Sequence, residues 1–512
     1  MSFFESLLAL MLAAILLLQV SRRLALPYPA MLAAAGVVLA LIPGTPAIGL
    51  DPEMALALFI APVLVDAAFD FPVGAVRRLW RPLFALAVVA VLLTAGAVAW
   101  LGMLVVGLPF FAALALGAIV APPDAAAATA VLGSVHMPRR SVAVLKGESL
   151  LNDALALLLF GTAIAIQQHG GIDPKIGLRL AIAAPGGVLL GIGLALAYRP
   201  ISRFVSGTLG GNLLEFVTCF GTWIVAERLH LSPVLCLVAF AMTIARNAGL
   251  TQPPRMRVHS FAVWESVVFL LNVLAFLLMG LQARSILGSM TPDRLQEAAG
   301  FAGLVIACVI VVRLAWVLAY NRLSWRFVAI RGDLPRPSLR QGVLVGWCGM
   351  RGLVSLATAF ALPADFPQRD LIVLTAFAVV LATLVVQGLT LVPLVRLLRL
   401  DGEDGLDREL ADARADLARV ALATLDGKSG PAADHWRYGY EVALDAAETG
   451  DAHQLDEKRK LGLTALRSQR KRLQTLRASH RIGPDAYLAL QEELDFRELA
   501  LATEDERHIE EI

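Results

Sequence analysis

Charged residues are scarce in this chain of 512 residues: they make up 17% of it, whereas hydrophobic residues make up 58%. Soluble proteins contain about 25% charged residues, so this composition excludes a wholly soluble globular protein. The mean hydropathy of +0.70 is typical of a polytopic membrane protein. The formal net charge is only +2, and we therefore expect no nucleic-acid partner.

Cysteine and histidine are also sparse. The chain has four cysteines, all in apolar stretches and none in a CxxC pair: Cys219, Cys236, Cys308 and Cys348. This spacing excludes a zinc finger and a disulfide framework, so we interpret them as small buried residues. The eight histidines form no HxxH pair. We therefore expect no metal centre and no cofactor.

The chain does contain apolar stretches long enough to cross a bilayer, which takes about 17–25 residues. We count thirteen, within a range of twelve to fourteen. They fall near 3–20, 26–43, 53–72, 82–106, 110–133, 141–167, 176–198, 212–229, 231–246, 261–283, 299–320, 338–361 and 370–398. The first lacks a preceding basic region, so we interpret it as a retained span and not as a signal peptide.

Basic residues lie mostly on one side of these stretches. Loops after odd-numbered spans carry most of them, for example Arg77, Arg78 and Arg81, and loops after even-numbered spans carry few. Because cytoplasmic loops carry the excess of lysine and arginine, we expect the N-terminus outside and the C-terminus in the cytoplasm. The expected transmembrane domain covers residues 1–399.

Residues 400–512 are charged and contain no apolar span. Leucines at helical spacing predict a helix from about 406 that stops at Gly427, a second in the basic stretch 457–477, and a third around 491–499 after Gly483-Pro484. We expect a regulatory cytoplasmic tail. Its basic face could meet anionic membrane lipid, solvent or a second copy of the chain.

Polar side chains interrupt the sixth apolar stretch, VLKGESLLNDALALLLF at 144–160. Ser149 and Asp153 share one helical face, and Glu148 and Asn152 share the adjacent face. Ionisable groups in a bilayer are costly and usually line an ion path, pair with one another or face the bundle interior. A hydroxyl beside a carboxylate offers oxygen ligands to a small cation, and the carboxylate can bind a proton instead. The alternative is that these groups only hold helices together.

Two other spans contain helix-breaking residues. Pro123 and Asp124 lie mid-span in AIVAPPDAAAAT, and Arg351 lies between Gly349 and Gly352 in GWCGMRGLVS. Proline removes a backbone donor and unwinds a helix. A pair of interrupted spans, one in each half of the chain, is typical of the binding site of an inverted-repeat transporter, with ordinary kinks as the alternative.

Two further charges concern the same site. Arg351 needs a carboxylate to neutralise it inside the membrane, and we expect Glu148 to be that partner. Asp66, in APVLVDAAFDF, lies deep in the third span and could belong to the ion path.

Four stretches resemble the bacterial sodium/proton exchangers of the NhaP type, within the monovalent cation:proton antiporter superfamily. They are APPDAAAATAVLGSVHMPRRSVAVLKGESLLNDALALLLF, VWESVVFLLNVLAFLLMGLQ, GWCGMRGLVSLATAFALP and LVVQGLTLVPLV, collinear over roughly 50–398. The resemblance implies an all-α, inverted-repeat, NhaA-like fold of thirteen helices with a dimerisation domain and a six-helix core. It also implies a homodimer that works by alternating access in the bacterial inner membrane.

The resemblance further implies residue roles. Asp153 would bind cation and proton alternately, Ser149 and Asp124 would be ligands, Asn152 resembles the asparagine of electroneutral members, Asp66 stands where a glutamate is usual, and Glu148 and Arg351 match a buried pair. Many members have Thr-Asp where this chain has Pro123-Asp124. That departure and the shorter Asp66 both bear on ion selectivity.

These observations predict a secondary transporter, and not an enzyme, that exchanges Na⁺ for H⁺ one for one. Potassium/proton exchange is an alternative, because a sequence does not separate ions that differ mainly in radius. A channel or sensor that signals through the tail is a second alternative, although the spans offer one compact polar cluster and no continuous polar path. An intramembrane hydrolase is disfavoured because Ser149 has no histidine in its span.

Overall fold

The computed structural model describes residues 11–12, 14–19, 31–33, 35–36, 52–124, 128, 139–171, 174–205, 208–251, 254–400, 405–451 and 453–503. Within these ranges the regular structure is entirely helical. The chain divides into two compact units, Met1–Gly402 and Glu403–Glu511. Most of the first two expected spans lies outside the described residues.

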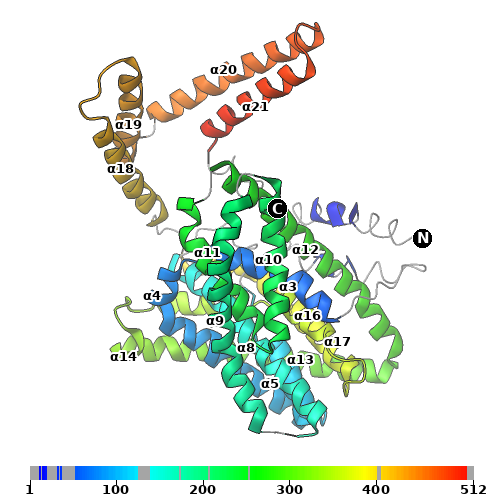
Figure 1. Cartoon of the computed structure of the whole chain (residues 1–512). Coiled ribbons are helices and arrows are strands. Elements are labelled where there is room, and N and C mark those ends of the chain that lie inside the picture. The colour runs from blue at the N-terminus through cyan, green and yellow to red at the C-terminus, as the bar shows by residue number, and fades with distance from the viewer. Residues whose placement is uncertain are drawn as a thin grey trace. The chain divides into compact units, whose positions relative to one another are not determined.

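Described helices of the first unit lie within each of the remaining expected spans (Figure 1). They are α3 (Pro52–Phe69), α4 (Val73–Phe84), the π-helical η1 (Ala85–Ala90), α5 (Val91–Val105), α6 (Phe110–Val120), α8 (Arg139–His169), α9 (Pro174–Val205), α10 (Leu209–Arg228), α11 (Pro233–Thr251), α12 (Pro254–Ser289), α13 (Pro292–Arg326), α14 (Val328–Arg331), α15 (Leu339–Trp347), α16 (Leu353–Phe360) and α17 (Arg369–Leu398). Six helical segments of the described chain are long and apolar enough to cross a membrane.

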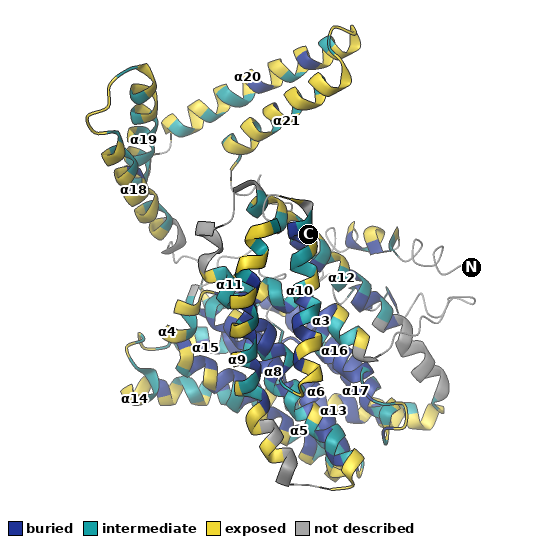
Figure 2. Cartoon of the chain, in the orientation of Figure 1, coloured by how far each residue is buried: buried dark blue, intermediate teal, exposed yellow. Residues whose placement is uncertain are grey.

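Small residues let several of these helices approach closely. A Cβ on Gly117 of α6 would overlap the backbone of Ala95 on α5, and one on Gly191 of α9 would overlap the backbone of Cys236 on α11. Without side-chain atoms between them, the helix backbones come into direct van der Waals contact. The centre of the unit is therefore densely packed: residues 115–120 of α6 are all buried. Figure 2 shows buried residues, in dark blue, gathered in the middle of this unit.

The two predicted helix interruptions are present. Helix α6 ends at Val120, and residues 121–124 are not helical. Helices α15 and α16 are separated by non-helical backbone at 348–352. Most of the chain that follows Asp124 in the fifth expected span lies outside the described residues.

The described part of the second unit, 405–451 and 453–503, contains four helices: α18 (Gly405–Leu425), α19 (Pro431–Thr449), α20 (His453–Ala478) and α21 (Pro484–Leu501). Three of them match the predicted tail helices, and α19 is additional. Gly427 has a φ of +74°, a conformation that glycine adopts without strain and that ends α18.

Helices α20 and α21 pack against each other through Leu466, Leu473 and Leu494. At their edge, Arg470 donates hydrogen bonds to Asp495 and Glu498. These bonds favour the charged guanidinium and raise the pKa of Arg470 above its ordinary value.

Candidate functional site

The two interrupted helices meet through their backbones. The N–H of Asp124 donates to the carbonyl oxygen of Met350 at 2.7 Å. The buried side chain of Arg351 donates from Nε to the carbonyl of Val120 at 3.0 Å, and from Nη1 to the carbonyl of Gly349. Helix ends leave backbone groups without partners inside the helix. Here each unwound segment supplies partners for the other.

Helix α8 places its polar side chains beside this crossing. The Nδ2 of Asn152 is buried and donates to the carbonyl of Pro123 at 2.8 Å. The next residue, Asp153, is 6% exposed, and the bond from Asn152 to Pro123 brings this part of α8 beside Asp124. Ser149 is half-buried one turn before Asp153. The carboxylates of Asp153 and Asp124 thus lie in one largely buried region.

Asp124 also faces the start of α16. Gly352 is the N-cap residue of this helix, and a Cβ at Gly352 would overlap the Asp124 carboxylate. The N-terminus of a helix carries a partial positive charge that stabilises a nearby anion. Only a glycine at this position leaves room for the Asp124 side chain as it lies.

Glu148 forms a buried ion pair with Arg313 of α13. The Arg313 Nη1 lies 2.5 Å from the Glu148 Oε1, and the two side chains are 2% and 1% exposed. A second bond joins Nη2 to Oε2 at 3.1 Å, and Nη2 also donates to the carbonyl of Val345. This bidentate geometry is the strong form of an arginine–carboxylate contact. The ion pair and the bond to Val345 together connect α8, α13 and α15.

The prediction that Arg351 neutralises Glu148 is therefore wrong. Arg351 donates instead to backbone carbonyls of the two unwound segments, which carry partial negative charge and replace a carboxylate. The sequence did hold a signal for the true partner, because Arg313 is the single charged residue in the stretch 299–320. A lone arginine in an apolar span requires a partner, and Glu148 supplies it.

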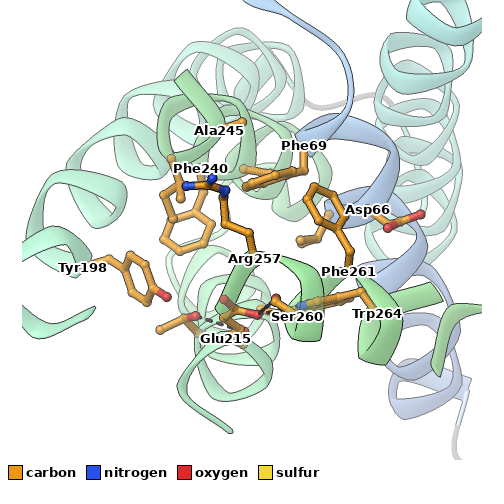
Figure 3. A pocket seen from close by; sticks show the side chains of 15 residues that line it. Asp66, Phe69, Tyr198, Glu215, Phe240, Ala245, Arg257, Ser260, Phe261 and Trp264 are labelled. Atoms are coloured by element: carbon orange, nitrogen blue, oxygen red, sulfur yellow. Dashed lines mark hydrogen bonds between the residues drawn. The ribbon is translucent and has the colours of Figure 1, made fainter. Parts of the chain in front are cut away.

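Asp66 lies on α3. It lines a cavity of about 270 Å³ with residues of α9, α10, α11 and α12, whereas Asp153, Asp124 and Ser149 are not among the lining residues. In this cavity the Glu215 carboxylate accepts hydrogen bonds from the Ser260 hydroxyl at 2.5 Å and from Trp264 Nε1 at 2.8 Å (Figure 3).

The other walls of the cavity are mainly apolar and aromatic. Figure 3 shows the Asp66 carboxylate directed away from Glu215 and Arg257.

The site defines a class of protein, a polytopic membrane transporter in which two unwound helices cross beside buried carboxylates. The profile of the sodium/hydrogen exchanger transmembrane family matches residues 8–397. The chain belongs to this family, as its motifs predicted.

Relatives and solved structures agree with this assignment. The chain is 31% identical over 502 residues to the uncharacterised Na⁺/H⁺ exchanger Rv2287 of Mycobacterium tuberculosis. The alignment covers 92% of this chain and 91% of the relative. It is 30% identical to the Na⁺/H⁺ antiporter NhaS2 of Synechocystis, over 82% of this chain and 75% of the relative.

It is also 29% identical to the sodium, potassium, lithium and rubidium/H⁺ antiporter of Bacillus pumilus, over 78% of this chain and 62% of the relative. The structure of the sodium proton antiporter MjNhaP1 from Methanocaldococcus jannaschii matches with a TM-score of 0.57 at 18% identity. That match covers 76% of this chain and 100% of the other, and it shows that the two share a fold. The protein is a multi-pass membrane protein of the cation:proton antiporter class.

Proposed function

We propose that the protein exchanges a monovalent cation, primarily Na⁺, for H⁺, and that Asp153 binds the two ions alternately. The observation that carries this proposal is the burial of Asp153 beside Asp124 at the crossing of the unwound segments. An ionised carboxylate offers oxygen ligands to a hard cation. The same carboxylate is neutral once it holds a proton, so the two ions compete for one site.

In the cation-bound state, Ser149 and Asp124 supply further oxygen ligands to the ion held by Asp153. Asp124 is half-buried and stabilised by the N-terminus of α16. Asp66 lines the cavity between α3 and the helices α9 to α12, and we assign it to the approach path of the ion and not to its coordination.

The exchange is electroneutral and one for one. Asn152 cannot carry a second charge, and its Nδ2 donates to the carbonyl of Pro123. A single carboxylate that changes between one cation and one proton keeps the same net charge in both states. A membrane potential that drives transport in sealed vesicles would contradict this stoichiometry.

Potassium/proton exchange is the second candidate. The relative from Bacillus pumilus is named for sodium, potassium, lithium and rubidium transport. In addition, Pro123 contributes no side-chain oxygen next to Asp124, so ligand number alone does not favour the smaller ion.

The surrounding architecture follows from the family. We propose thirteen spans arranged as an inverted repeat, with the N-terminus outside and the C-terminus in the cytoplasm of a bacterial cell, and a homodimer as the working unit. The arginine bias of the loops supports the orientation.

The deciding experiment is transport by the full chain in proteoliposomes with Na⁺, K⁺ and Li⁺, each tested for its ability to dissipate a preset pH gradient. We expect Asp153→Asn to reduce exchange to background while the purified protein keeps its elution volume and unfolding temperature. Asp70→Asn is the matched control, because Asp70 is exposed at the end of α3. Undiminished exchange by the Asp153→Asn variant would refute the proposed role of Asp153.

A further inference from the structure

Arginine and tryptophan side chains gather where α4, the last turns of α13 and the segment between α14 and α15 meet, outside the ion site. We call this group the arginine–tryptophan rim, and it consists of Trp80, Arg81, Arg322, Trp325, Arg326 and Arg336. It lies at the helix ends that the arginine bias of the loops places in the cytoplasm.

Direct contacts join the elements of the rim. Arg140, at the start of α8, donates from Nη1 to the carbonyl of Pro335 at 2.9 Å. The guanidinium of Arg81 on α4 packs against Gly332, which follows α14. The rim is therefore one connected surface and not a set of separate loops.

Three of the four guanidinium groups of the rim lie over exposed indole rings. Arg322 and Arg336 place their Cζ atoms 5.5 Å and 5.3 Å from the ring centre of Trp325, and Trp325 is 47% exposed. Arg81 lies in the same way over Trp80, at 5.4 Å. A cation–π contact holds a guanidinium by its face. The N–H edges of the guanidinium groups remain available to bind an anion.

The positive charge of the rim has little compensation from the protein. Asp333 is the single acidic residue in the segments 73–84, 139–146 and 320–340. In the described chain, no ion pair involves a rim arginine.

Exposed apolar side chains adjoin these arginines. Phe84, Phe327 and Val328 are 55%, 47% and 63% exposed. Arginines and aromatic residues with exposed apolar neighbours at the end of a membrane helix are typical of contact with the headgroup region of a bilayer.

We propose that the arginine–tryptophan rim binds the headgroup of an anionic phospholipid of the surrounding membrane, with its phosphate between Arg322 and Arg336. Arginine matches phosphate with paired N–H bonds, and anionic lipid attracts basic segments at the membrane surface. The exposed apolar side chains receive the acyl chains.

The rim occupies the end of α13, the helix of Arg313, and the connection from α13 to α15, the first half of the broken helix. A lipid bound to the rim therefore contacts α13 and the connection from α13 to α15, two elements that support the ion site.

The test measures lipid binding and does not require transport. The purified full chain is titrated with phosphatidylglycerol or phosphatidylcholine in mild detergent, and bound lipid is counted by native mass spectrometry. We expect Arg322→Gln/Arg336→Gln to weaken phosphatidylglycerol binding about thirtyfold. Each arginine near the membrane surface contributes about 1 kcal/mol of attraction to anionic lipid, and the loss of two corresponds to a change of this order in affinity. Phosphatidylcholine binding should not change.

The matched control is Arg228→Gln/Arg294→Gln, two exposed arginines at helix ends that the loop bias places on the other side of the membrane. The control should bind phosphatidylglycerol as the unchanged protein does, and Arg322→Lys/Arg336→Lys, which keeps the charge, should retain most of the affinity. If the double glutamine variant does not fold, Trp325→Leu takes its place, with a loss of about fivefold expected from the missing cation–π support.

Equal affinity in the unchanged protein and the rim variant, or an equal loss in the control, would overturn the proposal. Displacement of the lipid by glycerol phosphate at the same concentration would show a site for soluble phosphate and would overturn the assignment to membrane lipid.

Discussion

At the scale of single residues, the contact between Glu148 and Arg313 should matter most for stability. Both side chains are almost fully buried and joined by two hydrogen bonds. Arg313→Gln leaves the Glu148 charge unpaired in the membrane interior, which costs about 3–5 kcal/mol of unfolding free energy in proteins where it has been measured. We expect a clear fall in the unfolding temperature of the detergent-purified protein.

Two comparisons make this prediction specific. Arg294→Gln, on the same helix but exposed, should leave the unfolding temperature unchanged. Glu148→Leu/Arg313→Met should recover most of the loss, because replacing both charges by apolar side chains removes the unpaired charge. If Arg313→Gln unfolds at the same temperature as the unchanged protein, the pair is not the structural contact that we describe.

The same residues show how far a sequence can be interpreted at this scale. The positions of Ser149, Asn152 and Asp153 on one helix follow from spacing alone. The need of Arg351 for a partner follows from the cost of a charge inside the membrane. The choice between Arg313 and Arg351 depends on the rotation of α13. It also depends on backbone carbonyls that can accept a bond from Arg351 because the two helices unwind there. Spacing along the chain does not encode either of these facts.

At the scale of the elements, the fit of Asp124 against the start of α16 can be tested at Gly352. A methyl group there would overlap the Asp124 carboxylate, so Gly352→Ala must displace Asp124 from the N-terminus of the helix. We expect the rate of exchange in proteoliposomes to fall by about tenfold or more, since displacing a ligand by roughly 1 Å has effects of this order at a preorganised site.

The control for this substitution is Gly303→Ala in α13, where an added Cβ meets no atom within 4 Å. It should leave exchange unchanged, because alanine is also the better helix former. An active Gly352→Ala variant would mean that Asp124 does not need its present position, and would remove it from the proposed ligands.

Element by element, helix-breaking residues were the most informative part of the sequence. Pro122 and Pro123 predicted the end of α6, and Gly349 and Gly352 lie in the non-helical backbone at 348–352 before α16. The placement of Asp66 was less predictable. Its depth in the third span placed it near the membrane centre, but the direction of its side chain depends on how α3 packs on α11 and α12, and the structure places it on a cavity wall.

At the scale of the whole molecule, the change of composition at residue 400 corresponds to the boundary between the two compact units. The helical tail has its own apolar contacts at Leu466, Leu473 and Leu494. Its stability therefore does not depend only on the membrane unit. All residues of the proposed ion site lie before residue 400. The ion-exchange chemistry is therefore separate in sequence from the proposed regulatory role of the tail.

This separation predicts the effect of removing the tail. A chain truncated after Arg399 keeps the crossing of the unwound segments, the Glu148–Arg313 pair and Asp153, so we expect it to retain most of its cation-dependent exchange. If the tail is regulatory, the dependence of the rate on the pH of the tail side will change instead. The measurement is the rate against pH in proteoliposomes for the full and truncated chains, with Asp153→Asn introduced into each to define the background. A truncated protein that remains folded in detergent but exchanges no ions at any pH would show that the tail is part of the transport cycle and not a separate regulatory unit.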